Sequence, residues 1–434
     1  MEVTRYLACY TGPERPGKVM LFVMRRAAIL ELSAELWDGL QADDVPDCER
    51  ETLVRLGVLV ASRDAERAEM RSIFERLNAR SRRFTALVTL TLECNLACPY
   101  CYEEPFRGNF AMSESTADLL IQKTIERMDA GMDVVFDFYG GEALLALPIL
   151  RRIAGQLSHA ASQRGRIFEF NLVTNGTLLN RQTVQDLVDL GLKGAKLTLD
   201  GPKDIHDRQR PFISGSGSFD AILANIKATW DLVRIQLGSN YNRDNYERYP
   251  ELLDQLLAEG ITPDQLHMIV FYPVLPKSDS STFGDFSASC SCSSEPWLIE
   301  ASLYLREAIL KKGFNTPKPL PSACMVEFLN DLVIGYDGGL YKCPAFMGQE
   351  DLRVGTLLEG IGDYGATYNM GVWKTEECLD CPYLPFCYGG CRYLLRLRTG
   401  AIGGVDCRKD FLDAVLEKFV RQDLELRSSP SPMS

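Results

Sequence analysis

Six apolar runs in the middle of the chain alternate with segments in which apolar residues return at helical spacing. The runs are rich in Val, Ile, Leu and Phe, which is typical of parallel strands buried on both faces. Right-handed crossovers between such strands curl a sheet into a partial barrel. We therefore predict an α/β fold with a partial (β/α)6 TIM-like barrel. A doubly wound open sheet is the alternative, because the alternation of strands and helices along the chain is the same in both folds. The runs span residues 84–92, 133–140, 168–175, 194–201, 232–240 and 266–273.

Polar and glycine-rich residues follow each run at the point where its strand is expected to end. In βα-barrels the carboxyl ends of the strands gather on one rim, where function is usually built. The expected strand ends therefore bring thiols, glycines, carboxylates and amides around a single mouth. In chain order they are a cysteine triplet, Gly140-Gly141-Glu142, Thr174-Asn175-Gly176, Asp200-Gly201, Asn240 and Tyr272.

The segments on either side of the six runs differ in pattern and set the expected domain boundaries. The N-terminal part combines short strands with helices, and its charged end, residues 63–83, is expected to be one solvated helix. A Ser-rich loop and a helix lead from the barrel to a C-terminal part that includes a hairpin with Asp337 and Gly338 at its turn. A closing helix and a disordered tail follow. The expected units are residues 1–83, 84–276, 277–317, 318–410 and 411–434.

Composition places the chain among ordinary globular proteins. Of its 434 residues 46% are hydrophobic and 24% are charged, and no stretch approaches the ~18 uncharged apolar residues of a membrane span. The N-terminus lacks the pattern of an export signal, so we expect a cytoplasmic protein. A net charge of −12 argues against a general nucleic-acid or anionic-membrane surface.

Fourteen cysteines are present, and ten of them fall into two clusters, at positions 94–101 and 324–407. In a reducing compartment, clustered cysteines bind metal more often than they form disulfides. Both clusters are therefore expected to be metal sites. The cysteines outside them are Cys9, Cys48, Cys290 and Cys292.

Cys94, Cys98 and Cys101 form a C-x3-C-x2-C triplet directly after the first run. Three thiolates on one short loop hold three corners of an iron–sulfur cube and leave one iron free to bind a small molecule. Structural zinc is the alternative. Zinc sites of that kind are closed by a fourth ligand, however, and all three histidines are distant in sequence. The triplet therefore favours a cluster with an open iron.

The motifs "CNLACPYC", residues 94–101, and "FYGGEALL", residues 138–145, together resemble the radical S-adenosylmethionine enzymes. The resemblance implies that the triplet holds a 4Fe–4S cluster whose open iron chelates S-adenosylmethionine. It further implies that one-electron reduction cleaves this molecule to methionine and a 5′-deoxyadenosyl radical, which abstracts hydrogen from a substrate.

The same resemblance implies roles for residues at the strand ends. Gly140 to Glu142 would meet the methionine amino group, since glycines allow a close approach and a carboxylate suits an ammonium. Tyr100 lies where relatives contact adenine through the backbone. Asn175 and Asp200 are assigned to the cofactor mainly by position, and a plain turn is the alternative for Asp200.

The second cysteine array resembles the SPASM extension of radical enzymes that modify peptides and proteins. It matches the G-x4-C and C-x2-C-x5-C-x3-C elements of that extension. The resemblance implies two auxiliary 4Fe–4S clusters, of which the nearer is one ligand short in this chain. Cys290 or Cys292 is the preferred fourth ligand; an iron open to substrate, or two plain loop thiols, are the alternatives. The nearer set is Cys324, Cys343 and Cys391, and the distal set is Cys378, Cys381, Cys387 and Cys407.

One departure from the SPASM pattern narrows the class of enzyme that this chain resembles. Sulfatase-maturing relatives carry an Asp as general base directly after the G-x4-C cysteine, whereas Pro344 follows Cys343 here. Residues 199–226 resemble the peptide-maturing branch instead. Within them His206 and Asp207 are expected to order the loop, and Ser218 is expected to cap a helix.

These resemblances predict an enzyme that modifies a ribosomally made precursor peptide. Residues 1–83 resemble a winged-helix-like unit that captures a leader peptide by strand addition, with an inert cap as the alternative. The expected product is a Cys-to-carbon thioether, and carbon–carbon cross-linking and epimerisation are the alternatives. A flavodoxin or ferredoxin is the expected one-electron donor. A metal-stabilised peptide-binding scaffold and an electron carrier are the rival interpretations.

Overall fold

The fold is built on a ten-stranded sheet in which the six expected strands stand side by side in chain order. The structure is a computed structural model and describes residues 1–12, 16–101, 103, 108–274 and 295–427. From the second of these strands onward, each pairs in parallel with the one before it. This order confirms the partial barrel over the doubly wound alternative. The strands are β6 (Arg83–Thr91), β7 (Asp133–Gly140), β8 (Phe168–Val173), β9 (Leu192–Thr198), β10 (Arg234–Tyr241) and β11 (Met268–Pro273).

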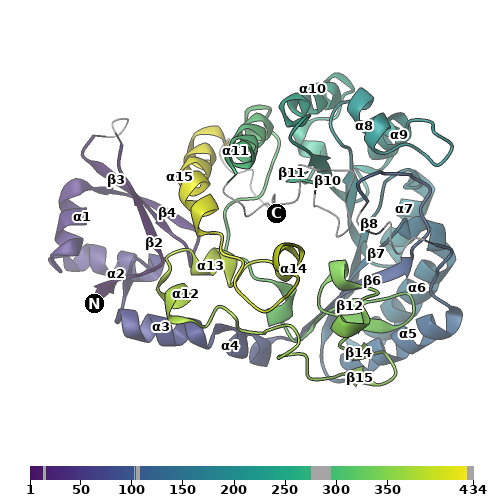
Figure 1. The fold of residues 1–434 in the computed structure, drawn as a ribbon, viewed down its shortest axis with the longest axis horizontal. Coiled ribbons are helices and arrows are strands. Elements are labelled where there is room, and N and C mark those ends of the chain that lie inside the picture. The colour runs from purple at the N-terminus through teal and green to yellow at the C-terminus, as the bar shows by residue number, and fades with distance from the viewer. Residues whose placement is uncertain (13–15, 102, 104–107, 275–294, 428–434) are drawn as a thin grey trace.

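Helices between these strands cover the outer face of the sheet (Figure 1). Two of them begin where a polar side chain caps the first turn. Ser113 accepts from the N–H of Thr116, and Asn180 accepts from the N–H of Thr183. The short helix α8 lies beside α9. The helices are α5 (Glu114–Asp129), α6 (Leu147–Arg164), α7 (Arg181–Asp189), α8 (Lys203–Gln209), α9 (Phe219–Thr229) and α10 (Pro250–Ala258).

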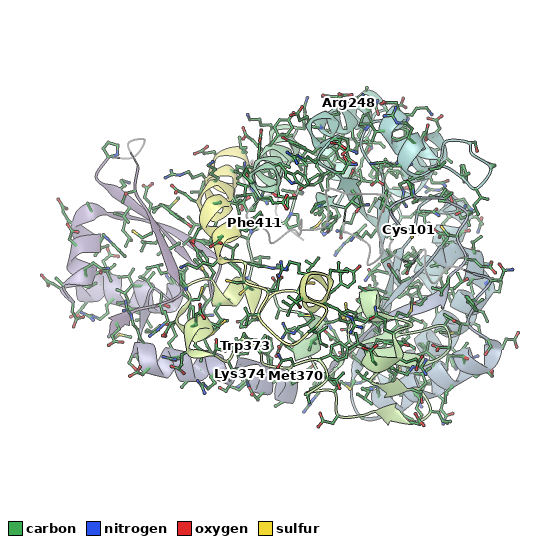
Figure 2. The ribbon with its side chains drawn as sticks, viewed as in Figure 1. Cys101, Arg248, Met370, Trp373, Lys374 and Phe411 are labelled. Carbon is green, nitrogen blue, oxygen red and sulfur yellow. The ribbon has the colours of Figure 1, made fainter. Side chains whose placement is uncertain are left out.

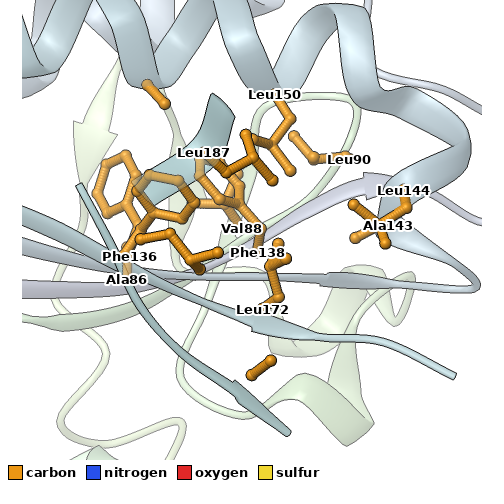
Figure 3. Packing of buried hydrophobic residues seen from close by; sticks show 14 of the residues in the cluster. Ala86, Val88, Leu90, Phe136, Phe138, Ala143, Leu144, Leu150, Leu172 and Leu187 are labelled. Carbon is orange, nitrogen blue, oxygen red and sulfur yellow. The ribbon is translucent and has the colours of Figure 1, made fainter. Parts of the chain in front are cut away.

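The two faces of the curved sheet differ in polarity. Phe136 and Phe138 of β7 are fully buried and pack with Val88 in the core between the sheet and the helices (Figure 3). Asp137 and Tyr139 alternate with them, face inward and are half-buried. The sequence predicted strands buried on both faces, and this is wrong for the inner face. That face is partly polar because it borders the mouth where the expected site residues gather.

The C-terminal part extends the same sheet from its first strand. β12 pairs in parallel with β6, and three short strands follow in antiparallel order. Asp337 and Gly338 form the turn between β12 and β13, which confirms the expected hairpin. The cysteine-rich part therefore grows directly out of the barrel. The added strands are β12 (Asp331–Ile334), β13 (Gly339–Tyr341), β14 (Gly355–Thr356) and β15 (Gly360–Ile361).

The N-terminal part forms a small unit beside the C-terminal helices (Figure 1). Its antiparallel sheet has the order β2-β3-β4, so β2 and β4 are the edge strands, and β1 pairs separately with β5. Apolar residues of β3, α1 and α2 form its core. The elements are β1 (Glu2–Val3), β2 (Leu7–Tyr10), β3 (Lys18–Val23), β4 (Ala28–Ser33), α1 (Ala34–Gln41), α2 (Asp47–Leu56), β5 (Leu59–Val60), α3 (Arg63–Arg71) and α4 (Ile73–Arg80).

The charged segment 63–83 differs from the expected solvated helix. It forms two helices that meet at Ser72, and Met70 and Phe74 are buried within one apolar cluster. The same cluster contains the fully buried Trp373 of the C-terminal part, which lies beside these helices (Figure 2). The prediction is wrong because a narrow apolar stripe is hidden among many charges. That stripe joins the N-terminal unit to the cysteine-rich part.

Two long helices, α11 and α15, pack side by side between the N-terminal unit and the barrel (Figure 1). Arg306 of α11 donates to Gln422 over 3.0 Å and to Asp423 over 2.5 Å, and all three side chains are largely buried. Among the described residues, no helix is long and apolar enough to cross a bilayer. The C-terminal helices are α11 (Pro296–Lys311), α12 (Glu376–Asp380), α13 (Leu384–Cys387), α14 (Arg392–Thr399) and α15 (Lys409–Leu426).

Replacing Phe74 with alanine tests the junction between α4 and the cysteine-rich part. The Phe74 ring centroid lies 5.6 Å from that of Trp373 and 4.9 Å from that of Tyr388. Emptying such a site lowers the free energy of unfolding by about 3–5 kcal/mol. Leu77→Ala on the same helix is the control, because Leu77 is 46% exposed and its loss costs less than about 0.5 kcal/mol. Urea unfolding of both variants measures the difference, and equal losses would contradict the buried junction.

Candidate iron–sulfur and cofactor site

The cysteine triplet lies on the loop that leaves the C-terminal end of β6, and Cys101 is at the inner side of the sheet (Figure 2). The N–H of Leu96 donates to Sγ of Cys94 over 3.5 Å, so the loop folds back on its first thiol. Burial raises the pKa of Cys98, and the charges of Cys101 and Cys94 act in the same direction. The three thiols therefore lie near one another. A buried group of this kind forms thiolates readily beside a strong cation such as cluster iron.

Gly140 and Gly141 allow the end of β7 to lie directly against the residues before the triplet. A Cβ on Gly140 would stand 2.1 Å from the carbonyl oxygen of Thr91, and one on Gly141 would stand 2.2 Å from that of Glu93. The N–H groups of Gly141 and Glu142 donate to those same carbonyls over 2.9 and 2.7 Å. The sequence predicted a close approach to a ligand. The structure places the close approach at the backbone leading into the cysteine loop.

The Glu142 carboxylate joins the ends of β7 and β8. Its Oε1 accepts from the N–H of Leu144 over 3.0 Å and from the hydroxyl of Thr174 over 2.7 Å. Its Oε2 accepts from the N–H of Asn175 over 2.7 Å. Burial raises the pKa of Glu142, and these hydrogen bonds oppose the rise. Three of the roughly four acceptor positions of the carboxylate are thus taken by the protein. The contact with a methionine ammonium stays a prediction.

Asn175 connects this carboxylate to the cysteine loop. Its Nδ2 donates to Oδ1 of Asn95 over 2.7 Å and lies 3.8 Å from Sγ of Cys94. Its Oδ1 accepts from the N–H and the hydroxyl of Thr177, over 2.9 and 2.7 Å. Asn175 therefore supports the first thiol from the end of β8, whereas its predicted contact with the cofactor is not tested.

Tyr100 and Asp200 belong to a buried polar network on the other side of the loop. The Tyr100 hydroxyl donates to Asp200 and accepts from Nη1 of Arg210 over 2.7 Å. The N–H of Asn240 donates to Oδ1 of Asp200 over 2.6 Å. Burial raises the pKa of Asp200, and Arg210 opposes the rise. Asp200 is fully buried and thus does more than close a turn.

Arg210 is a site residue that no sequence signal identified, because it stands in an ordinary charged stretch. Its Nη1 lies 3.7 Å from Oδ2 of Asp200, and its Nε has no hydrogen-bond partner in the described part of the chain. Burial acts to lower the pKa of Arg210, but Tyr100, Cys98 and Asp200 hold it well above its ordinary value. A permanent positive charge therefore stands beside the cysteine loop.

His206 and Asp207 order the loop after β9, in agreement with the prediction. Nδ1 of His206 accepts from the N–H of Asp200 over 3.0 Å, and its Nε2 lies 2.9 Å from the hydroxyl of Ser218. Asp207 accepts from the N–H of Phe219 over 2.9 Å at the start of α9. The prediction that Ser218 caps this helix is wrong, because its hydroxyl donates to a backbone carbonyl over 2.6 Å instead.

The nearer auxiliary set gathers beside β12 and β13. Burial raises the pKa of Cys343 far above its ordinary value, and the charges of Cys324 and Cys391 act in the same direction. The three thiols therefore lie near one another, and their role as ligands of one cluster stays a prediction. Cys290 and Cys292 lie outside the described residues, so the fourth ligand stays a prediction.

The distal auxiliary set lies around α12 and α13. Burial raises the pKa of Cys387 to about 11, and Cys381 and Cys378 act in the same direction. Cys407 acts likewise on Cys381. The set comprises Cys378, Cys381, Cys387 and Cys407, which the structure brings together.

Tyr139 lies near both the triplet and the nearer auxiliary set, and the sequence did not single it out. It stands on the inner face of β7, directly before Gly140. Burial raises the pKa of Tyr139, and the charges of Cys101 and Cys343 raise it further. Cys101 of the triplet and Cys343 of the nearer auxiliary set are therefore both close enough to Tyr139 to act on its hydroxyl.

The donors of all three cysteine sets are thiols, and thiolates are the ligands of iron–sulfur clusters. Within the described residues, no three His, Cys, Asp or Glu side chains are arranged to hold one ion. In an iron–sulfur cube each thiolate binds a different iron, so the residue types present fit such clusters.

Comparison with known proteins gives a family match and several similar proteins. Residues 88–284 match the radical SAM superfamily. The cysteine-type anaerobic sulfatase-maturating enzyme of Clostridium novyi is 24% identical over 332 residues, covering 69% of this chain and 85% of that enzyme. The solved structure of native anSMEcpe with bound AdoMet and Cp18Cys peptide has a TM-score of 0.59 at 18% identity, covering 78% of this chain and 98% of that chain. Streptococcus suis SuiB bound to precursor peptide SuiA has a TM-score of 0.52 at 14% identity, covering 94% and 98%.

Glu142→Gln tests the carboxylate that joins β7 and β8. The glutamine amide would place its N–H₂ group against one of the three groups that donate to Glu142. That buried donor would lose its acceptor, which lowers the free energy of unfolding by about 1–3 kcal/mol. Displacing Asn175 from the first thiol is expected to lower iron retention about tenfold. Thermal unfolding and iron content per chain measure both effects. Glu126→Gln on the surface of α5 is the control. If Glu142→Gln retained the iron content of the wild type, Glu142 would not support the cysteine loop through Asn175.

His206→Gln tests the buried imidazole. Burial, followed by the charges of Arg210 and Lys203, holds the pKa of His206 well below its ordinary value. Below about pH 6.5 the unfolded chain binds a proton that the fold excludes. Folding stability contributed by this group is therefore present at neutral pH and falls by up to about 1.4 kcal/mol per pH unit below that point. Urea unfolding between pH 7.5 and 5.5 is expected to show a shallower loss for His206→Gln. Equal slopes would refute the buried neutral imidazole.

Proposed function

Because this chain is a radical S-adenosylmethionine enzyme with iron–sulfur clusters, we propose that it modifies a ribosomally made precursor peptide. The favoured product is a thioether between a Cys sulfur and a carbon of the same peptide. When bound, the radical cluster and S-adenosylmethionine supply a 5′-deoxyadenosyl radical after one-electron reduction by an external donor such as a flavodoxin or ferredoxin. Thioether formation is then an oxidation of the peptide by two electrons.

The observation that carries the proposal is the continuation of the barrel sheet from β6 into the strands that lead to the nearer auxiliary set. One set follows β6 and the other follows β12 and β13, which extend the same sheet from β6. A reaction that removes a hydrogen atom and then an electron requires an electron acceptor near the radical site. An electron carrier would have no use for an open iron, whereas the triplet supplies only three thiols for its cluster.

The residues fit the cofactor roles as follows. We propose that Cys94, Cys98 and Cys101 hold the radical cluster, and that the strand ends from Gly140 to Glu142 and at Asn175 surround the methionine part. Tyr100 and Asp200 stand on the adenine side. The nearer auxiliary cluster takes Cys324, Cys343 and Cys391, with Cys290 or Cys292 as its fourth ligand, and the distal cluster takes the remaining four thiols.

A peptide substrate is supported by the N-terminal unit. Edge strand β4 has no second neighbour among the described strands, so its N–H and C=O groups can pair with an extended leader peptide. Peptides are bound in the structures of anSMEcpe and SuiB that resemble this chain. An inert cap is the alternative for this unit.

Forming a thioether removes one hydrogen atom, one proton and one electron from the peptide. The bound cofactor would supply the acceptor for a hydrogen atom from a peptide carbon, which would leave with 5′-deoxyadenosine. The Cys thiol would lose its proton and form the C–S bond to that carbon. The surplus electron would need an acceptor, and the auxiliary clusters held by the second cysteine array would supply one. Pro344, which follows Cys343, offers no side-chain base, so formylglycine formation is disfavoured.

Carbon–carbon cross-linking and epimerisation are alternatives within the same radical chemistry. Cross-linking of either kind removes two hydrogens from the peptide, whereas epimerisation returns a hydrogen and leaves the mass unchanged. Alkylation of free thiols before mass spectrometry separates a thioether, which consumes a thiol, from a carbon–carbon link. A non-catalytic, metal-stabilised scaffold would cleave no S-adenosylmethionine.

Anaerobic reconstitution followed by co-expression with a Cys-bearing peptide from a neighbouring reading frame tests the proposal. We expect about twelve irons per chain, four for each of three cubes. Cys98→Ala is expected to reduce 5′-deoxyadenosine formation to background, because it removes a ligand of the radical cluster. Cys48→Ala changes an exposed thiol and serves as the matched control.

The peptide is expected to lose two hydrogens and one alkylatable thiol per cross-link. A wild-type enzyme that cleaves S-adenosylmethionine and leaves the mass and stereochemistry of every such peptide unchanged would refute peptide maturation. Iron without any cleavage would instead favour an electron carrier, and zinc without iron would favour a scaffold.

A further inference from the structure

Lys196 lies on the inner face of the barrel sheet. Its neighbours Ala195 and Leu197 on β9 are buried in the core against the helices, so Lys196 points to the opposite face. It pairs in register with Gln236 of β10, whose side chain shares the same face. Both are half-buried. An ammonium and an amide therefore stand side by side on the inner wall of the barrel.

The Lys196 side chain reaches across β10 toward the mouth. A Cβ on Gly238 would stand 3.5 Å from Cε of Lys196, so the missing side chain at that position leaves room for the lysine stem. Nζ of Lys196 lies 4.8 Å from the ring centroid of Tyr272, near the end of β11. Tyr272 is 36% exposed and Lys196 itself is only half-buried, so this pair of side chains is partly open to solvent.

The ammonium of Lys196 has no hydrogen-bond acceptor and no ion-pair partner among the described residues. Burial lowers its pKa, and the charge of Asp137, two strands away, partly opposes this. Asp137 itself accepts from Nδ2 of Asn171 over 2.8 Å. A half-buried cation is poorly hydrated and gains from an incoming anion. The side chain of Gln236 likewise has no hydrogen-bond partner among the described residues. Its amide N–H can donate to a carboxylate oxygen.

The place of this pair connects it with the radical site. Tyr272 pairs in register with Asn240, which donates to Asp200 in the Tyr100 network. The strand ends assigned to the methionine part of the cofactor lie on β7 and β8. Tyr272 lies on β11, three strands beyond β8 in the sheet order. The ammonium is therefore near the end of β11 and away from the strand ends that we assign to the methionine part of the cofactor.

We propose that Lys196, assisted by Gln236, binds a side-chain carboxylate of the substrate peptide and so selects an acidic residue beside the reacting position. This inference rests on the proposed function, because it requires a peptide in the mouth of the barrel. It adds a specificity that the cysteine motifs do not contain. A charge-assisted contact of this kind is worth about tenfold in affinity.

The test uses the reconstituted holoenzyme with S-adenosylmethionine and two acetylated, amidated pentapeptides, Gly-Ala-Glu-Ala-Gly and its Gln twin. Saturation-transfer difference NMR measures their dissociation constants. Wild type is expected to bind the Glu peptide about tenfold more tightly than the Gln peptide. Lys196→Gln is expected to remove the preference, and Lys196→Arg to keep most of it. Lys193→Gln, on the same strand but 57% exposed, removes the same charge and is expected to keep it all.

Iron content and thermal unfolding check that each variant is folded, and the wild-type preference tests the proposal without any variant. Equal affinities for the two peptides, including no binding of either, overturn it. A Lys196→Gln enzyme that retains the preference for the Glu peptide would also overturn the proposal. A variant that loses only affinity for S-adenosylmethionine would overturn it too, because Lys196 would then bind the carboxylate of the cofactor. An unchanged precursor mass would refute peptide maturation separately, because it does not depend on these affinities.

Discussion

The arrangement of the mouth depends on one buried carboxylate, that of Glu142. Burying a charged carboxylate is costly unless it is fully hydrogen-bonded, and here two backbone N–H groups and one hydroxyl compensate it. Those donors come from the end of β7 and the end of β8, so the strand ends are held in one relative position. The compensation works only if Gly140 and Gly141 allow β7 to lie against the cysteine loop.

A second buried charge, on Asp200, holds the opposite side of the same loop. Arg210, Tyr100 and Asn240 surround it, and His206 receives its backbone N–H. The triplet is thus supported from β8 on one side and from β9 and β10 on the other. Neither network uses a cysteine as its main partner, so the thiols remain available to bind iron. The polar residues at the strand ends therefore act first as a frame for the loop.

The sequence alone predicts the strands and their order well, because long apolar runs separated by helical segments admit few topologies. It also predicts which cysteines gather, because their spacing is specific. It fails where one residue depends on a distant partner. Phe74 looks like part of a solvated helix until Trp373 is placed beside it, and Arg210 acquires meaning only beside Tyr100. Lys196 is similar, since nothing in "GAKLTLDG" shows that Gly238 of the next strand leaves room for its stem.

The continuation of the sheet from β6 into β12 gives the two cysteine sets a fixed relation. Ile334 pairs with Val88, so the hairpin that leads to Cys343 starts from the strand that leads to the triplet. Backbone pairing therefore ties the strand that leads to the nearer auxiliary set to the strand that leads to the triplet. The electron transfer that we propose would use this fixed relation between the two strands. A free domain joined by a linker would not provide this, and that difference favours an oxidative reaction over simple radical generation.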